Sequence, residues 1–512
     1  MKRDGYCTSA WQSRTLAYVP QNNLRAGELP TNEFDVVIVG GGITGISTAL
    51  KLQKAGKKCI VLEAHNLGFG TTGGTSAHLN TILDTPYYQI ANDFGKENAQ
   101  LVASAARNAI EWIKRNVDEH NIECDFKEVK GYIFAQIDTQ IDELQKLLDS
   151  ANEVKEHVVF ADKIPIPIPF QKAIVFDKQA QFNPIEYLHG IAEVFESIGG
   201  IIIEDCRVTH VESDGKMATV TSACGEVKGR HLVYATHIPP GVNILNFTCA
   251  PYRSYVLAIK LRTDDYPNAL VYDMYNPYRY YRTQEINGEK YLIFGGEDHK
   301  TAHEKNTEKC FRELESYARQ FFNVQSVDYK WSSQYYEPAD GLPYIGHLPG
   351  NANNIYAATG FGGNGLIYGT ASALILSDLI VQGKSEYKDL FSPARIKPIA
   401  GFENAAKETA DVAKNLVSGW LSSEKLYNLI ELSRGEGKVV TYDGKKIALY
   451  KDEAGKLFAV NPACPHINCS VNWNTAEKSW DCPCHGSRFS CTGAMLTGPA
   501  NTDLEKIDLR DK

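Results

Sequence analysis

Long runs of like charges or of a single residue type are scarce in this sequence. Its 53 lysine and arginine residues stand against 62 aspartate and glutamate residues, a net charge of −9 with no block of like charges. This balance excludes a typical nucleic-acid-binding protein. Glycine and proline, at 41 and 21 residues, are too few for a fibrous or low-complexity chain. The hydrophobic fraction of 43% is that of a globular protein, and 512 residues suffice for two or three domains.

The sequence also has no apolar run that is typical of a membrane-spanning or leader segment. The polar residues that follow Met1 leave no room for the apolar run of a secretory signal, so we expect a cytoplasmic protein. Residues 357–381 are weakly charged, but a glycine-rich turn and Asp378 interrupt them. We therefore expect no transmembrane segment.

The 12 cysteines do not have the spacing of a disulfide framework. Seven are scattered between Cys7 and Cys310, and we expect these to be small buried side chains. The other five crowd a short C-terminal stretch: Cys464, Cys469, Cys482, Cys484 and Cys491. Such clustering suggests a metal site.

A nucleotide-binding pattern lies near the N-terminus. A β-branched run over residues 34–39 leads into a glycine-rich turn and a helix, and a second apolar run ends at Glu63. The turn contains Gly40, Gly42, Ile43, Thr44 and Gly45. Such a strand, turn, helix and strand lets the backbone approach a pyrophosphate and places Glu63 to accept hydrogen bonds from a ribose. The pattern predicts a parallel sheet of the α/β class, does not separate NAD from FAD, and leaves a purely structural turn as the alternative.

Small residues recur in three further segments. Residues 70–76 contain Thr71, Thr72 and Gly73; residues 231–236 form an expected strand, preceded by Val208; residues 340–346 precede a second turn. That turn contains Gly360, Gly362, Gly363, Asn364 and Gly365. Together with the first turn, these segments resemble the D-amino acid oxidase superfamily of FAD-dependent oxidoreductases. The resemblance implies bound FAD, with Val208 at the adenine and the last turn stabilising negative charge on the reduced flavin. Glycines that serve only close packing are the alternative.

Candidate residues near the flavin follow from the same resemblance. The spacing of His78 resembles the histidine that binds flavin covalently in the dimethylglycine and sarcosine dehydrogenase branch, although we favour a loop histidine without a covalent bond. A tyrosine- and arginine-rich set lies on expected strands around residues 253–282. Because strand side chains alternate, Tyr280 and Arg282 share a face, and they are our candidates for facing the flavin and clamping a substrate carboxylate. A structural sheet surface is an equal alternative.

Two C-terminal loops each offer a cysteine and a histidine. We assign Cys464, His466, Cys482 and His485 as ligands of a [2Fe–2S] cluster with thiolates on one iron and imidazoles on the other. The loops resemble Rieske proteins of the cytochrome bc-complex type. The resemblance implies a disulfide between Cys469 and Cys484. A zinc site with the same ligands is the alternative.

In the same resemblance, Gly498, Pro499 and Ala500 form a third loop over the cluster, and Ser487 bonds a bridging sulfide. Phe489 stands where many high-potential Rieske proteins have tyrosine. The missing hydroxyl implies a lowered potential.

These expectations define an organisation. We predict an N-terminal extension (residues 1–33), an FAD-dependent oxidoreductase (34–400), a helical linker (401–422) and a small all-β Rieske domain (423–512). Within the oxidoreductase, the Rossmann-like nucleotide-binding parts are residues 34–85, 180–250 and 335–382, and the intervening segments form an α+β substrate domain.

The expected function follows from the two cofactors. FAD oxidises a small substrate, an amine or amino acid, and the cluster passes electrons singly to an external acceptor protein. Reverse flow, in which an external donor protein feeds the cluster for a reductive or oxygen-activating step, is one alternative, and a non-catalytic redox carrier or sensor is another. Since the two cofactor sites lie in different domains, we expect Cys464→Ser or His485→Ala to remove the cluster and leave FAD bound.

Overall fold

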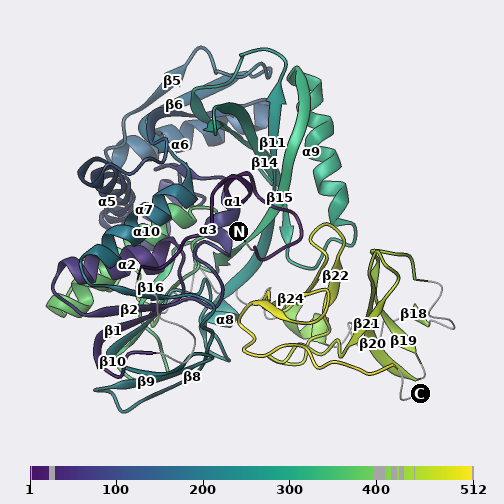
Figure 1. Cartoon of the computed structure of the whole chain (residues 1–512). Helices are drawn as coiled ribbons and strands as arrows, with labels where there is room; N and C mark the ends of the chain where they lie inside the picture. Colours follow the sequence, from purple (N-terminus) through teal and green to yellow (C-terminus); the bar gives the residue numbers. More distant parts are fainter. Residues whose placement is uncertain are drawn as a thin grey trace.

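The computed structural model describes residues 1, 3–21, 29–395, 410–416, 424–425, 432–442 and 444–509. Two large sheets form the body of the molecule, and two four-stranded sheets form its C-terminal part. Figure 1 shows the C-terminal strands of residues 472–497, in yellow, next to the second large sheet, with the other C-terminal strands farther out. The predicted combination of an α/β fold with an all-β C-terminal domain is confirmed.

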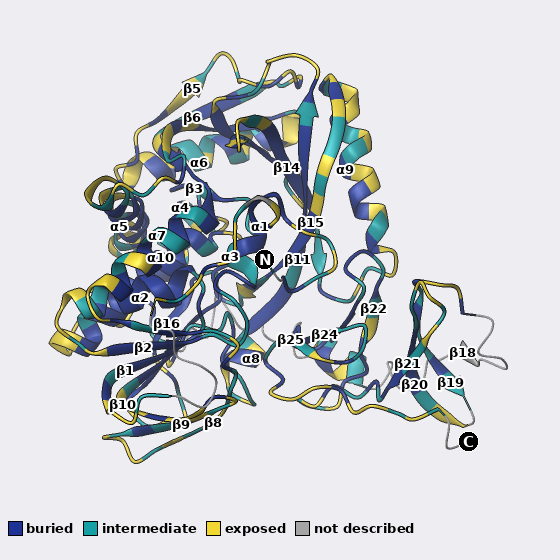
Figure 2. Ribbon diagram, viewed as in Figure 1, coloured by how far each residue is buried: buried dark blue, intermediate teal, exposed yellow. Residues whose placement is uncertain are grey.

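The first large sheet has the strand order β16-β17-β10-β1-β2-β7, with β8 and β9 added through β10. Its strands are β1 (Phe34–Val39), β2 (Cys59–Leu62), β7 (Ile201–Ile203), β8 (Val208–Ser213), β9 (Ala218–Ser222), β10 (Gly225–Tyr234), β16 (Tyr344–His347) and β17 (Ile355–Thr359). The central strands β17, β10, β1, β2 and β7 run parallel. Strands β1, β2 and β17 are almost wholly buried, which is why they read as continuous apolar runs, whereas β10 is buried mainly at its C-terminal end (Figure 2).

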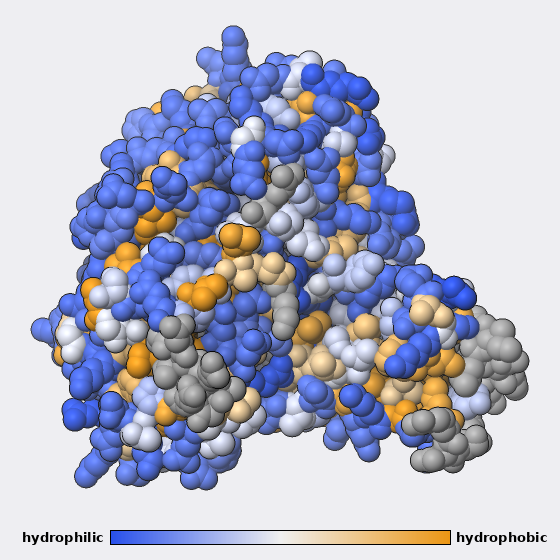
Figure 3. Space-filling model, in the orientation of Figure 1, coloured by the Kyte–Doolittle hydropathy of each residue, from blue (hydrophilic) through white to orange (hydrophobic). Residues whose placement is uncertain are grey.

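Helices cover this sheet. They include α2 (Ile43–Lys54), α5 (Lys96–His120), α7 (Pro184–Ser197) and α10 (Gly365–Gln382), and α10 packs on both α2 and α5. Among the described residues, α10 is the one helix long and apolar enough to cross a membrane, and 72% of it is buried inside the protein. The outer face drawn in Figure 3 is mostly hydrophilic, with apolar side chains in separate groups.

The second large sheet has the order β15-β11-β14-β13-β12-β4-β6-β3, with β5 on β6. Its strands are β3 (His78–Leu79), β4 (Lys127–Ala135), β5 (Val158–Ala161), β6 (Lys172–Gln181), β11 (Cys249–Leu261), β12 (Ala269–Asp273), β13 (Tyr280–Ile286), β14 (Glu289–Lys300) and β15 (Val324–Pro338). Its helices are α4 (Tyr87–Phe94), η1 (Asp138–Gln140), α6 (Ile141–Glu153) and α9 (Thr307–Phe321). The short helices α3 (Thr71–Gly74) and α8 (Leu245–Thr248) lie near the junction of the two sheets (Figure 1).

The C-terminal part contains two small sheets. One is β18 (Glu424–Lys425), β19 (Gly437–Tyr442), β20 (Lys445–Lys451) and β21 (Leu457–Val460), and the other is β22 (Asn472–Asn474), β23 (Ser479–Asp481), β24 (Arg488–Ser490) and β25 (Met495–Thr497). Of the predicted linker, residues 410–416 are helical, and the rest lies outside the described residues.

The N-terminal segment is a buried part of the fold. Helix α1 (Ala10–Arg14) carries Trp11, which is 0% exposed and donates to the carbonyl of Thr75 at 2.7 Å. Arg3 pairs with Glu477 at 3.3 Å, and Asp4 pairs with Arg488 at 3.0 Å. Sequence patterns gave no sign that this segment joins the first half of the chain to the Rieske domain.

Candidate functional site

The glycine-rich turn between β1 and α2 is shaped by contacts that exclude side chains. Gly40 has a φ of +112°, and a Cβ there would lie 2.5 Å from the carbonyl oxygen of Ala235. A Cβ on Gly45 would lie 1.9 Å from the carbonyl oxygen of Gly40. The turn thus brings the N-terminus of α2 to one end of a cavity of about 300 Å³. This arrangement suits a pyrophosphate.

Glu63 follows β2 at the same end of the cavity. Its carboxylate accepts hydrogen bonds from the backbone N–H groups of Gly41 at 2.6 Å and His65 at 2.9 Å. Burial raises the pKa of Glu63, and these backbone donors partly offset that effect. Each carboxylate oxygen has two acceptor sites, so the carboxylate can also accept from a ribose.

The cavity collects residues from all parts of the predicted flavin site. Of the predicted cofactor-binding residues, those in its wall are Gly40, Gly42, Ile43, Thr44, Glu63, Thr71, Thr72, Val208, Gly362, Gly363, Asn364 and Gly365. The remaining three, Gly45, Gly73 and Gly360, lie behind the wall, and a Cβ on Gly73 would meet the carbonyl oxygen of Gly68 at 2.2 Å. These three glycines shape the cavity by close packing.

The second glycine-rich turn leads into α10. Gly360 and Gly362 have φ values of +74° and +55°. The Asn364 side chain accepts from the backbone N–H of Asp84 at 2.8 Å, which joins the turn to the chain after β3. The 18-residue helix α10 therefore begins at the cavity, where its N-terminal N–H groups favour negative charge.

His78 lies in the cavity wall, on the short strand β3 rather than on the expected loop. Its Nδ1 is 2.9 Å from the hydroxyl of Ser76, and its buried Nε2 has no hydrogen-bond partner among the described residues. The ring lies 5.4 Å from that of Tyr272 and 5.5 Å from that of Tyr280. Burial, aided by the nearby Arg282 charge, lowers the pKa of His78 to about 3, so the imidazole is neutral.

The two predicted substrate residues separate in space. Tyr280 lines the cavity, and a Cβ on Gly295 would lie 2.3 Å from its hydroxyl oxygen, so glycine at that position makes room for the ring. Arg282 is 0% exposed and does not line the cavity. Its guanidinium donates to the carbonyls of Ala77 and Phe182 and to the side chain of Gln284.

Sequence reasoning missed most of the cavity's far end, on the second large sheet. There the wall includes Ser254, Tyr272, Tyr278, Asp298 and Tyr335. Asp298 lies near the C-terminal end of strand β14. The sequence does not show which distant strands pair, and this pairing decides which side chains share a face of the sheet.

The four predicted cluster ligands converge in the C-terminal domain. Cys464 and Cys482 are buried at 0% and 1% exposure, and their thiols contact each other. The rings of His466 and His485 are 4.9 Å apart. The Nδ1 atoms of both histidines are buried, and no described residue forms a hydrogen bond with them. Two thiols and two unpartnered imidazole nitrogens fit a [2Fe–2S] centre with mixed ligation.

Outer contacts orient these ligands. The Nε2 of His466 lies 3.2 Å from the carbonyl oxygen of Gly241, which leaves Nδ1 for a metal. Burial and the neighbouring His466 lower the pKa of His485 to about 3, so this ring is neutral, as a metal ligand must be. The hydroxyl of Ser487 accepts from the backbone N–H of Ala500 in the third loop, and Phe489 is fully buried.

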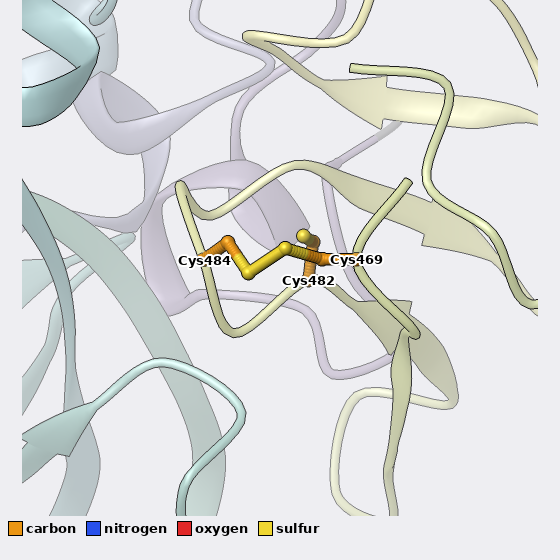
Figure 4. A group of neighbouring side chains, drawn as sticks. All are labelled: Cys469, Cys482 and Cys484. Atoms are coloured by element: carbon orange, nitrogen blue, oxygen red, sulfur yellow. A yellow bond between two sulfur atoms is a disulfide. The ribbon is translucent and has the colours of Figure 1, made fainter. Parts of the chain in front are cut away.

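A disulfide joins Cys469 and Cys484 beside the ligands, with the Cα atoms 6.5 Å apart. Figure 4 shows the thiol of Cys482 close to this bond. The sulfurs of these three residues lie within 4.8 Å of one another. Because two of them are bonded together, Cys482 alone among them can act as a thiolate ligand.

The two sites adjoin. Residues Met495–Thr497 of β25, with Gly498, Ala500 and Asn501, form part of the cavity wall. Arg207 donates to the carbonyl of Met495 at 2.8 Å, and the backbone N–H of Gly241 donates to the carbonyl of Pro499 at 2.9 Å. The expected third Rieske loop therefore lines the cavity and, through Ala500 and Ser487, also contacts the loop that carries Cys482 and His485.

The comparisons agree with this geometry. The family described as FAD dependent oxidoreductase matches residues 35–379, and the Rieske [2Fe-2S] domain matches residues 424–508. The chain therefore belongs to the FAD-dependent oxidoreductases, is an enzyme of that family, and carries a C-terminal Rieske domain. The predicted cofactors, FAD and a [2Fe–2S] cluster, are confirmed.

Particular relatives share this organisation to different extents. The chain is 34% identical to the Rieske 2Fe-2S iron-sulfur protein YhfW of Bacillus subtilis (strain 168), over 93% of this chain and 94% of that protein. It is 24% identical to gamma-glutamylputrescine oxidoreductase of Escherichia coli (strain K12), over 72% of this chain and 88% of that enzyme. Glycine oxidase from Geobacillus kaustophilus matches the fold with a TM-score of 0.61 at 16% identity, covering 72% of this chain and 100% of that chain.

Proposed function

We propose that the protein oxidises a small amine or amino-acid-like substrate by hydride transfer to FAD. The electrons then pass singly through the Rieske cluster to an external acceptor protein. When bound, FAD supplies hydride acceptance and conversion between two-electron and one-electron transfer, and the cluster supplies one-electron carriage. Relatives named for gamma-glutamylputrescine and glycine support the substrate class.

The observation that carries the electron path is the position of β15 between the two sites. Thr71, in the cavity wall, donates to the carbonyl of Gln334 at 2.9 Å. The Gln334 side chain donates to the carbonyl of Gly486 at 2.9 Å, and Tyr336 donates to the carbonyl of His485 at 3.1 Å. One strand thus contacts the flavin loop and the backbone of a cluster ligand. This continuity supports direct transfer between the cofactors within one chain.

Residue roles follow from position. Tyr280, in the wall of the cavity, is the candidate substrate contact. Arg282 holds the carbonyl of Ala77, next to His78, and is proposed as a positioning residue. His78 presents a neutral imidazole beside the cavity and is proposed as a non-covalent neighbour of the flavin. Release of all FAD from acid-denatured protein would support this assignment, and retained flavin would contradict it. Location in the cytoplasm stays part of the proposal.

The test is an anaerobic reduction of the holoenzyme, monitored by two spectroscopic signals. Candidate amines and amino acids are added, flavin absorbance is followed by stopped flow, and frozen samples are examined by electron paramagnetic resonance. The proposal expects flavin bleaching first and the signal of a reduced His-ligated [2Fe–2S] cluster afterwards. Cluster reduction by an external donor protein that precedes flavin reduction, with no bleaching by any substrate, would establish reverse flow instead.

A further inference from the structure

The far end of the cavity contains a carboxylate that pairs with no cation in the part of the chain that the structure describes. Asp298, on β14, accepts from the hydroxyl of Ser254 at 2.5 Å and from that of Tyr335 at 2.9 Å. The hydroxyl of Tyr280 lies 3.0 Å from that of Ser254. Both donors to Asp298 are neutral, and its two oxygens keep acceptor sites free. Within the described residues no arginine or lysine forms an ion pair with Asp298.

The arginines of this sheet are engaged elsewhere. Arg253 donates to Ser332, and Arg279 pairs with Asp273 at 3.4 Å and with Glu297 at 3.2 Å. Arg282 is bound to backbone carbonyls behind the wall. Among the described residues of the cavity wall, the one arginine is Arg207, which borders the nucleotide-binding sheet and holds the third Rieske loop.

Tyrosine rings surround the same end. Tyr272 and Tyr278 have ring centroids 6.2 Å apart, and Tyr278 and Tyr280 have centroids 6.1 Å apart. The hydroxyl of Tyr278 donates to a second carboxylate, that of Asp84, at 3.0 Å. Tyrosine faces and carboxylates both attract cations. A substrate carboxylate placed here would meet the carboxylate of Asp298, with that of Asp84 behind Tyr278, and no guanidinium, and an uncompensated charge in such a place is costly.

We propose that this end of the cavity binds a cationic amine without a carboxylate beside its amino group, with Asp298 as the counter-ion. The inference rests on the proposed function and narrows its substrate class from amines and amino acids to amines. A carboxylate clamp by Arg282, expected from the sequence, has no part in this arrangement because its guanidinium lies outside the cavity wall.

Binding is tested separately from turnover, with ions that cannot donate a hydride. Tetramethylammonium chloride and sodium acetate are titrated into the oxidised holoenzyme against a sodium chloride baseline of equal ionic strength, and the flavin absorbance spectrum is followed. We expect tetramethylammonium to perturb the spectrum saturably and acetate to leave it unchanged. Asp298→Asn should weaken tetramethylammonium binding by about tenfold, as expected for loss of one sheltered charge contact. Glu297→Gln removes the same charge from the next residue, whose carboxylate faces Arg279. At pH 8, where Asp298 is charged, this variant should leave binding unchanged.

Turnover is then tested with pairs that differ only in the carboxylate, such as putrescine and ornithine or phenethylamine and phenylalanine. Faster flavin bleaching by the amine of a pair supports the inference. Faster bleaching by the amino acid leaves the proposed function standing and overturns the inference, as would acetate binding more tightly than tetramethylammonium. Saturable cation binding that needs Asp298, without bleaching by any compound, supports the cation site and contradicts the proposed oxidation. If Asp298→Asn does not retain FAD, Asp298→Glu tests the same contact, because it keeps the charge but its longer side chain displaces the carboxylate.

Discussion

The cluster site and the flavin cavity differ in how far apart their residues lie along the chain. All four proposed cluster ligands fall between Cys464 and His485, on two loops of one small domain. The cavity wall runs from Val39 to Asn501 and takes residues from both large sheets and from the Rieske domain. A short-range site can be read from spacing alone, whereas a long-range cavity depends on strand pairing and on how the domains pack.

The two regions also differ in how their polar atoms are satisfied. At the proposed cluster site, buried imidazole nitrogens have no hydrogen-bond partner among the described residues, as expected of metal ligands. At the far end of the cavity, two hydroxyl groups already donate to the carboxylate of Asp298. Its remaining acceptor sites therefore favour a cationic ligand, but the carboxylate does not need one. Variants at the first kind of site should abolish a cofactor, and variants at the second should change affinity.

The largest effect is expected at the glycine turn. Gly45→Ala places a Cβ 1.9 Å from the carbonyl oxygen of Gly40, so the turn must open, and we expect loss of bound FAD and of all substrate-dependent activity. Flavin content per protein after purification measures the effect. Ser47→Ala on the same helix is the control, because the Ser47 hydroxyl is buried without a hydrogen-bond partner. Full flavin content in Gly45→Ala would contradict the assigned turn.

Loss of a cluster ligand comes next. Cys464→Ser should abolish the electron paramagnetic resonance signal of the dithionite-reduced cluster and reduce electron transfer to an acceptor to background, while FAD stays bound. Cys491→Ser should change neither, since Cys491 is outside the ligand set. The shared loop sharpens this test, because residues 495–498, 500 and 501 line the flavin cavity and Ala500 also donates to Ser487 in the second cluster loop. Complete loss of FAD from Cys464→Ser would show that this loop takes its position from the cluster.

Much of this architecture could be predicted from the sequence, but not all of it. The turn at Gly40 and the loops at Cys464 and Cys482 are local, and backbone geometry or ligand chemistry constrains them strongly. Arg282 and Asp298 show the limit. Strand alternation placed Arg282 on the same face as Tyr280, but the packing of Trp11 and Gln284 around its guanidinium could not be foreseen. Equally, the burial of Arg3 and Asp4 depends on charges of the distant Rieske domain.

The affinity of the far end of the cavity for a cation should depend on pH by about tenfold. Burial raises the pKa of Asp298 to about 7, so the carboxyl is protonated below that pH and charged above it. An alkylammonium keeps its charge throughout this range. Tetramethylammonium affinity should therefore rise from pH 6 to pH 8 and then level off, as the spectral titration can measure.

Neighbouring groups identify which carboxyl titrates. Tyr335 and Tyr280 face Asp298 with pKa values raised above 10, so they stay neutral. Asp84 and Glu297 are the nearby acids, and their charge raises the pKa of Asp298 further. Asp298→Asn should flatten the pH profile. A flat profile in Asp84→Asn, with the rise retained in Asp298→Asn, would transfer the role to Asp84.

The smallest effect is expected where the two regions meet. Tyr336→Phe removes the hydroxyl that donates to the carbonyl of His485, while Gln334 keeps its bond to Gly486. A donor near the cluster stabilises the added electron, so its loss should lower the cluster potential by up to about 60 mV, equivalent to a tenfold change in the electron equilibrium. Spectroelectrochemical titration measures this shift, with Tyr368→Phe as the control because the Tyr368 hydroxyl is buried without a partner.

The rate of flavin-to-cluster transfer then separates two roles for this strand. A lowered potential with a proportionate decrease in rate would mean that Tyr336 acts through the driving force alone. A rate that falls at unchanged potential would mean that the contact from β15 to the cluster loop is itself part of the transfer route. If neither the potential nor the rate changes, the contact only holds the domains together. The cluster site and the cavity would then have no functional connection through Tyr336.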